Sequence, residues 1–220
     1  MSGRLLLFDL DGCLVDSTPA ITGSIRHALQ QLGVSPPAAD TLRWCVGPPL
    51  HESFATLLTE PRVDAHRVRA AVDAYRAHYA ATSTQATTVI PGIEAALAAV
   101  AAEATLAVVT SKPGEVARPI LDHLGLAAWF TAVHAPRADH QVEAKAVTLR
   151  RALDGLMVGA VARPVMIGDR SHDIEAGRVC GTATVGVTWG AGDREELEAA
   201  GADLIVDSPS YLPEAVRSLP

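Results

Sequence analysis

Hydrophobic positions along the chain follow two alternating patterns. Short apolar runs rich in β-branched residues are typical of parallel strands covered on both faces, whereas longer stretches carry apolar residues at helical spacing. The predicted strands are Leu5–Phe8, Thr105–Val109, Thr131–His134, Val165–Ile167, Thr184–Val187 and Leu204–Val206. The predicted helices between them span 92–104, 115–125, 141–156 and 193–201. This alternation predicts an α/β fold with a three-layer, Rossmann-like core around a mainly parallel sheet.

The segment after the first strand lacks this alternation. No convincing strand occurs between Thr18 and about Ser83, and Thr18–Pro19 is typical of a helix start with Thr18 as the N-cap. A second long helix is predicted over 62–80, and 82–92 is predicted to be the linker back to the core. We therefore expect a small all-helical cap domain, inserted after the first strand. The predicted boundaries are 18–83 for the cap and 1–17 with 84–220 for the core.

The composition is that of a globular protein, with 49% hydrophobic and 20% charged residues. The sequence has no uninterrupted run of about 20 apolar residues, so no membrane span is predicted. The N-terminal sequence also lacks the pattern of a secretory signal. The three cysteines (Cys13, Cys45 and Cys180) are scattered and odd in number, which favours a reducing cytoplasm over a disulfide framework. The net charge of −7 without a basic run argues against nucleic acid as the main partner.

Lysine is rare in this chain. Of the 18 basic residues, only Lys112 and Lys145 are lysine. Genomic base composition can replace lysine by arginine wherever charge alone matters, so the remaining lysines indicate places that need a compact ammonium. The alternative is that both survive by chance as surface residues, Lys145 on a solvated helix face.

Polar side chains follow three of the predicted strands where each strand ends. They are Asp9 and Asp11 after the first strand, Thr110, Ser111 and Lys112 after the second, and Asp169 after the fourth, with Asp173 in the next helix turn. Since ligand sites lie at the carboxyl ends of parallel strands, these groups are predicted to converge on one edge of the sheet. Each motif alone also fits turn or helix-cap chemistry. An EF-hand is excluded because Cys13 stands fifth in the loop, where the pattern needs an acid or Asn.

Taken in order, FDLDGCLVDS, VVTSKP, Lys145 and MIGDRSHD resemble the four motifs of the haloacid dehalogenase-like (HAD) superfamily. The resemblance spans essentially the whole chain. The helical insert is similar to the C1 cap of the phosphoglycolate phosphatase-like branch, and GPPLHESF fits the same branch, including its 5′-nucleotidase-like members. The segment HAPRADHQVE departs from the pattern, because relatives often carry an acidic, glycine-containing loop there.

The resemblance implies a Mg²⁺-dependent phosphatase of a small phosphorylated metabolite. Asp9 would be the nucleophile that forms an aspartyl-phosphate, and Asp11 would be the general acid and base. Since superfamily members that cleave carbon–halogen bonds lack the second Asp, Asp11 favours phosphoryl chemistry. The implied metal ligands are Asp9, the backbone carbonyl of Asp11, Asp169 and, through water, Asp173. The implied phosphate ligands are Thr110, the backbone at Ser111, and Lys145.

Candidates for substrate selection are Gly47, Pro48, Pro49 and Leu50, which form a turn in the insert, and Lys112. Phosphoglycolate-like acids and nucleoside monophosphates are the expected substrate classes. Two alternatives remain open: a phosphotransferase or sugar-phosphate mutase that passes the phosphoryl group to a hydroxyl, and a non-catalytic regulator that binds phosphate esters. The sequence does not indicate an oligomeric state.

Overall fold

The computed structural model describes residues 4–58, 64–136, 143–156 and 163–219. The chain forms two compact units, which are treated separately below. The larger consists of Met1–Asp16 and Val89–Pro220, and the smaller of Ser17–Thr88. The chain passes between them at β2 (Val15–Asp16) and β3 (Thr88–Val89), which pair as a two-stranded sheet.

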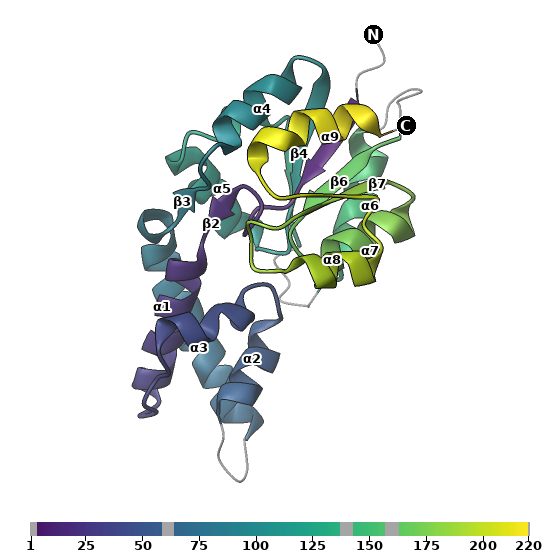
Figure 1. The fold of residues 1–220 in the computed structure, drawn as a ribbon. Helices are drawn as coiled ribbons and strands as arrows, with labels where there is room; N and C mark the ends of the chain where they lie inside the picture. Colours follow the sequence, from purple (N-terminus) through teal and green to yellow (C-terminus); the bar gives the residue numbers. More distant parts are fainter. Residues whose placement is uncertain (1–3, 59–63, 137–142, 157–162, 220) are drawn as a thin grey trace. The chain divides into compact units, whose positions relative to one another are not determined.

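The larger unit is built around a six-stranded sheet. Its strands are β1 (Arg4–Phe8), β4 (Ala104–Val109), β5 (Ala132–His134), β6 (Val165–Gly168), β7 (Ala183–Val187) and β8 (Leu204–Val206). They lie in the order β5-β4-β1-β6-β7-β8, and all neighbours run parallel (Figure 1). The six predicted strands are therefore confirmed, with ends that differ by no more than one residue.

Helices cover both faces of this sheet. One face carries α4 (Ile93–Ala101), α5 (Gly114–His123) and α9 (Leu212–Ser218), and the other carries α6 (Lys145–Leu156), α7 (Ser171–Cys180) and α8 (Arg194–Ala200). Side chains of β1 point alternately to the two faces of the sheet: Leu6 and Phe8 pack into one core cluster, and Leu5 and Leu7 pack into the other. The predicted three-layer α/β architecture is confirmed, and the two covered faces explain why the strands are mainly apolar.

The smaller unit is helical. It contains α1 (Thr18–Gln31), a 3₁₀ helix (Ala39–Cys45), α2 (Leu50–Leu57) and α3 (Ala65–Ala86). Aromatic side chains join α2 and α3: the Phe54 and Tyr75 rings pack edge-to-face with their centroids 6.3 Å apart. Within α3, the Tyr79 ring stacks on that of Tyr75 with a centroid distance of 5.3 Å.

Several predicted boundaries differ from the structure, among them the helix predicted over 92–104, which ends at Ala101. Ser17, not Thr18, is the N-cap of α1, and Pro19 lies in the first turn. The linker predicted from Thr82 is still helical through Ala86, and Thr82 Oγ1 donates back to the His78 carbonyl at 2.9 Å, as Thr does within a helix. The helix predicted over 141–156 begins at Lys145; residues 141–142 lie outside the described part of the chain.

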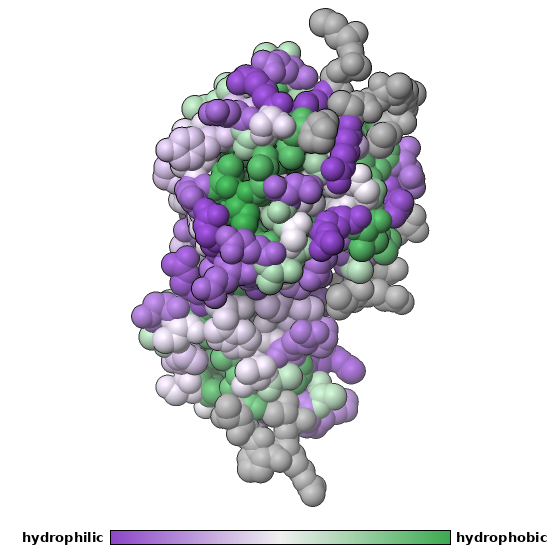
Figure 2. All heavy atoms as spheres, turned by 45° about the vertical axis from the view of Figure 1, so that its right-hand side comes forward, coloured by the Kyte–Doolittle hydropathy of each residue, from purple (hydrophilic) through white to green (hydrophobic). Residues whose placement is uncertain are grey.

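Within the described residues, no helix is long and apolar enough to cross a membrane. On the face of the larger unit in Figure 2, hydrophilic side chains surround a patch of hydrophobic ones. Exposed large apolar side chains of this unit are Val147, Val179 and Tyr211. These three residues lie on three different elements, and single exposed apolar side chains of this kind are ordinary for a globular protein.

Candidate active site

The strand order brings the predicted site residues to one edge of the sheet. Strands β4, β1 and β6 are neighbours, and Thr110, Asp9 and Asp169 respectively follow them. The Asp9 backbone N–H donates to the Ile167 carbonyl at 2.8 Å, which extends the pairing of β1 and β6 by one residue. The Asp9 carboxylate is therefore placed at the carboxyl end of the central strand, where ligand sites of such sheets lie.

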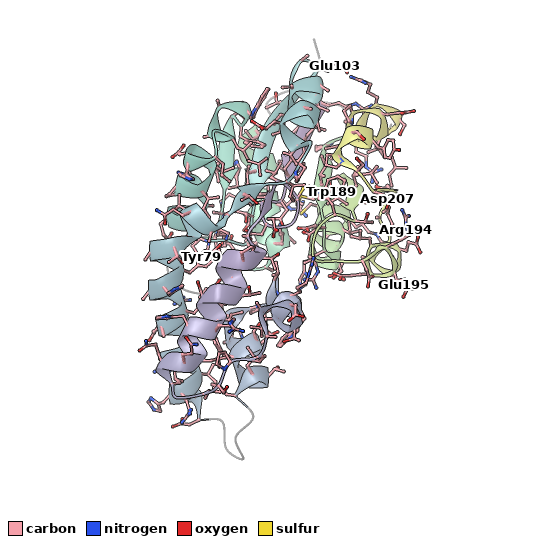
Figure 3. The ribbon with its side chains drawn as sticks, turned by 60° about the vertical axis from the view of Figure 1, so that its left-hand side comes forward. Tyr79, Glu103, Trp189, Arg194, Glu195 and Asp207 are labelled. Atoms are coloured by element: carbon pink, nitrogen blue, oxygen red, sulfur yellow. The ribbon has the colours of Figure 1, made fainter. Side chains whose placement is uncertain are left out.

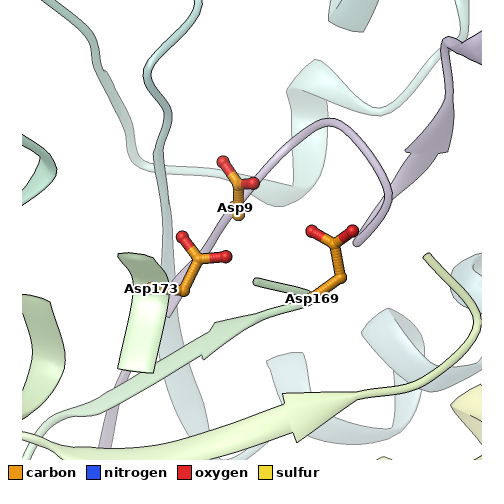
Figure 4. A group of neighbouring side chains, drawn as sticks. All are labelled: Asp9, Asp169 and Asp173. Carbon is orange, nitrogen blue, oxygen red and sulfur yellow. The ribbon is translucent and has the colours of Figure 1, made fainter. Parts of the chain in front are cut away.

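Three carboxylates gather at this edge (Figure 4). Asp9, Asp169 and Asp173 each offer one oxygen, and these atoms lie within 4.8 Å of one another. The residues are only 8%, 1% and 1% exposed. Asp173 arrives from the first turn of α7, where its Oδ2 also accepts from the Arg170 backbone N–H at 3.1 Å. Buried carboxylates this close are unfavourable unless positive charge lies between them.

Lys145 supplies part of that charge. Its Nζ lies 2.5 Å from Asp9 Oδ1 and 2.6 Å from Asp173 Oδ1. The residue begins α6 and is 9% exposed, so a solvated helix-face position is ruled out. The two carboxylates hold the pKa of Lys145 above its usual value, although burial opposes the charged form.

Asp11 has a different partner. Its Oδ1 lies 3.0 Å from Lys112 Nζ, and both side chains are mostly buried. The Lys112 backbone N–H donates to Thr110 Oγ1 at 3.1 Å, which ties this lysine to the end of β4. The two lysines of the chain thus pair with the two acids of the first motif, one each.

The remaining charge balance favours a cation. Among the described residues, four carboxyl groups face two ammonium groups here, so full ionisation of the acids would leave excess negative charge at this edge. Burial raises the pKa of Asp9 to about 7, although the Lys145 ammonium acts to lower it. Burial, together with the nearby carboxylates of Asp173 and Asp9, raises the pKa of Asp169 well above its usual value. Asp169 Oδ1 is buried without a hydrogen-bond partner in the described structure. A hard divalent cation such as Mg²⁺ fits this donor set, since it prefers carboxylate oxygens.

The other predicted residues are distributed as follows. Thr110 is buried at the end of β4, whereas Ser111 is exposed. Gly47, Pro48 and Pro49 form the turn before α2 in the smaller unit, and Leu50 begins that helix. A role of this turn in substrate selection stays a prediction.

Comparison with known proteins decides the family. The profile described as "Haloacid dehalogenase-like hydrolase" matches residues 6–187, which include every motif residue discussed above. The chain belongs to this family. The predicted superfamily is therefore confirmed, as is the expectation of an enzyme of the hydrolase class.

Two sequence relatives and one structure illustrate the range of this HAD-like family. Tyrosine-protein kinase PtkA of Mycobacterium tuberculosis is 35% identical over 204 residues, 93% of this chain and 68% of that protein. A 5′-nucleotidase of Pseudomonas aeruginosa is 36% identical over 194 residues, 88% of this chain and 86% of that protein. The structure of a "predicted phosphatase" from Clostridium acetobutylicum aligns with a TM-score of 0.88 and 33% identity, covering 100% of both chains.

Sequence reasoning missed the glycines that surround the acids of this HAD-like site. A Cβ on Gly12 or Gly190 would lie 2.2 Å from Asp169 Oδ2, and one on Gly168 would lie 2.2 Å from the Asp173 carboxyl. Gly190 follows β7, the strand beside β6, so its position at the same sheet edge was a usable signal. Only glycine fits at these positions without displacing an acid.

Proposed function

We propose that the protein is a Mg²⁺-dependent phosphatase that hydrolyses a small phosphomonoester through an aspartyl-phosphate. The observation that carries the proposal is the buried cluster of Asp9, Asp169 and Asp173 with Lys145 at the carboxyl edge of the sheet. Membership in the hydrolase family and the likeness to a 5′-nucleotidase support a phosphoric monoester hydrolase. Phosphoglycolate-like acids and nucleoside monophosphates are the substrate classes to test first.

Asp9, Asp169 and the backbone carbonyl of Asp11 would hold Mg²⁺, with Asp173 acting through water. When bound, the ion would neutralise negative charge at the acids and on the incoming phosphate. Asp169 Oδ1 has no hydrogen-bond partner in the part of the chain that the structure describes, and this supports the assignment because a buried carboxylate oxygen without a donor is costly.

Asp9 would attack phosphorus with one carboxylate oxygen. Its backbone is fixed at the strand end by the bond to Ile167, and Lys145 binds its Oδ1. A carboxylate held in this way is oriented for attack before substrate arrives, which is the main benefit of a preorganised site. Lys145 would also bind phosphate oxygens, together with the hydroxyl of Thr110 and the backbone at Ser111.

Asp11 would move protons. As an acid it would protonate the leaving oxygen of the ester, and as a base it would take a proton from the water that attacks the aspartyl-phosphate. Lys112 Nζ lies 3.0 Å from Asp11 Oδ1, so this ion pair would hold the Asp11 carboxyl group in place. Each acid of the first motif is thus paired with its own lysine, and the two acids would have different tasks: nucleophilic attack for Asp9 and proton transfer for Asp11.

The proposal is tested with a generic aryl phosphate in the presence and absence of Mg²⁺. Wild-type protein is expected to hydrolyse it only with Mg²⁺, and Asp9→Asn is expected to be inactive. Inertness of the wild type over a broad phosphomonoester panel, or full activity of Asp9→Asn, would overturn the proposal. Cytoplasmic location and a metabolite rather than nucleic acid as partner also stay predictions.

A second candidate is transfer of the phosphoryl group to a sugar or protein hydroxyl. The likeness to PtkA, which is named a tyrosine-protein kinase, favours keeping it. Both candidates share the attack by Asp9 and differ in the final acceptor. Labelled phosphate that appears as inorganic phosphate supports the hydrolase, and label retained on a second organic acceptor supports the transferase.

A further inference from the structure

The loop between β7 and α8, residues 188–193, lies directly against Asp169. The Ala191 backbone N–H donates to Asp169 Oδ2 at 2.7 Å. A Cβ on Gly190 would lie 2.2 Å from the same oxygen, and a Cβ on Gly192 would lie 2.0 Å from the Asp169 carbonyl oxygen. The two glycines thus allow a main-chain approach that any side chain would block.

This contact leaves the two oxygens of the Asp169 carboxylate in different states. Oδ2 accepts the Ala191 N–H, whereas Oδ1 is buried and has no partner within the described residues. The carboxylate is thereby fixed by one oxygen and keeps the other for a ligand. Groups that orient a metal ligand in this way contribute strongly to metal affinity.

Trp189 ties the same loop to the turn that follows the proposed nucleophile. Its indole Nε1–H donates to the Cys13 carbonyl at 3.0 Å, and its ring packs against the main core cluster. Cys13 follows Gly12, which has no side chain and so leaves room for the Asp169 carboxylate. A single indole therefore spans the two backbone segments that enclose this acid.

The base of the loop is anchored separately. Thr188 Oγ1 donates to Asp207 Oδ1 at 2.8 Å, and Arg194 binds both oxygens of Asp207 at 2.7 and 2.8 Å (Figure 3). Loss of the Trp189 bond alone would consequently leave both ends of the loop in place. The expected consequence is a displaced Ala191 N–H rather than an unfolded loop.

We infer that the loop 188–193 is a positioning element for Asp169 and that Trp189 is the positioning residue that holds it against the nucleophile turn. The inference rests on the proposed metal site and extends it to residues outside the four motifs. It assigns to Trp189 a contribution to metal affinity, made through Ala191 and without contact to the ion.

The test measures binding of Mn²⁺ alone to the full chain by calorimetry. Trp189→Phe keeps an aromatic ring and removes the N–H donor. Trp129→Phe is the matched control, because Trp129 packs against the same core cluster and lies in a different segment. We expect a dissociation constant about 10-fold higher for Trp189→Phe and unchanged for Trp129→Phe. The thermal midpoints of the metal-free variants are measured alongside.

A wild-type dissociation constant in folded Trp189→Phe would overturn the inference while leaving the metal site intact. If that variant does not fold, Gly192→Ala decides, because its Cβ would meet the Asp169 main-chain carbonyl oxygen and so displace the loop without meeting the carboxylate: weaker Mn²⁺ binding supports the inference and unchanged binding overturns it. Absence of Mn²⁺ binding by the wild type would instead overturn the proposed metal site itself.

Discussion

Lys145 Nζ lies 2.5 Å from Asp9 Oδ1, so the proposed nucleophile is paired with a buried ammonium. The same nitrogen binds Asp173 at 2.6 Å. This geometry gives Lys145 two tasks, since it balances charge in the metal-free site and provides a donor for phosphate oxygens. The tasks make separate predictions, one for stability and one for activity.

Replacement of Lys145 by Met is expected to lower kcat/KM about 10²–10³-fold, as loss of one preorganised donor does. In EDTA the free energy of unfolding should also fall, by about 3 kcal/mol, because two buried carboxylates lose their partner. Steady-state kinetics and urea unfolding measure the two effects. Mg²⁺ should restore part of the stability of Lys145→Met, and a variant with wild-type activity would contradict the assigned role.

Asp11→Asn should separate the two chemical steps. A substrate with a good leaving group, such as p-nitrophenyl phosphate, needs little help from the acid, so the first step should proceed. Hydrolysis of the intermediate should slow by about 10²–10⁴-fold, because no base activates the water. Rapid-quench kinetics should then show a burst of p-nitrophenol followed by slow turnover. Equal slowing of both steps, without a burst, would argue against the dual role.

Gly12→Ala should abolish Mg²⁺-dependent activity, because its Cβ would lie 2.2 Å from Asp169 Oδ2. Gly181→Ala is the matched control: Gly181 has a similar positive φ of 77°, against 80° for Gly12, but apart from its chain neighbours no described residue comes within 4 Å of its Cβ position. Both variants should lose about 1 kcal/mol of stability from the left-handed backbone conformation. Equal activity in the two variants would show that the contact with Asp169 does not matter.

The metal-free protein should lose stability between about pH 4 and about pH 7. Asp9 has a pKa of about 7 in the folded chain against 3.8 for an unperturbed aspartate, so in this window the folded state keeps a proton that the unfolded chain has released. The stabilisation from Asp9 is therefore fully present below the unfolded pKa of 3.8 and is lost as the pH rises through the folded pKa of about 7.

Thermal unfolding in EDTA measures this effect as the difference between wild type and Asp9→Asn. That difference cancels the contribution of His78 and His134, whose lowered pKa values act in the opposite direction. Stabilisation by Mg²⁺ should in turn increase over the same range. A wild-type midpoint that rises relative to Asp9→Asn between pH 5 and pH 7 would contradict the raised pKa of Asp9.

Much of this architecture was readable from the sequence because parallel strands covered on both faces are mainly apolar, as β1 is from Leu5 to Phe8. The acids could be placed at one sheet edge for the same reason. The pairing of Lys112 with Asp11 and of Lys145 with Asp9 could not be predicted, since it depends on how side chains share a buried space. Trp189 escaped notice because its role lies in one long-range hydrogen bond, to a residue 176 positions away.

The central claim is that Asp9 carries the phosphoryl group, and its most direct test is to trap the intermediate. Wild-type protein is mixed with substrate and Mg²⁺, quenched in acid within milliseconds, and mapped by peptide mass spectrometry. We predict a single phosphorylated peptide, modified at Asp9, that is absent without Mg²⁺ and absent in Asp9→Asn. A phosphoryl group on any other residue, or rapid turnover with no phosphorylated peptide, would contradict this account.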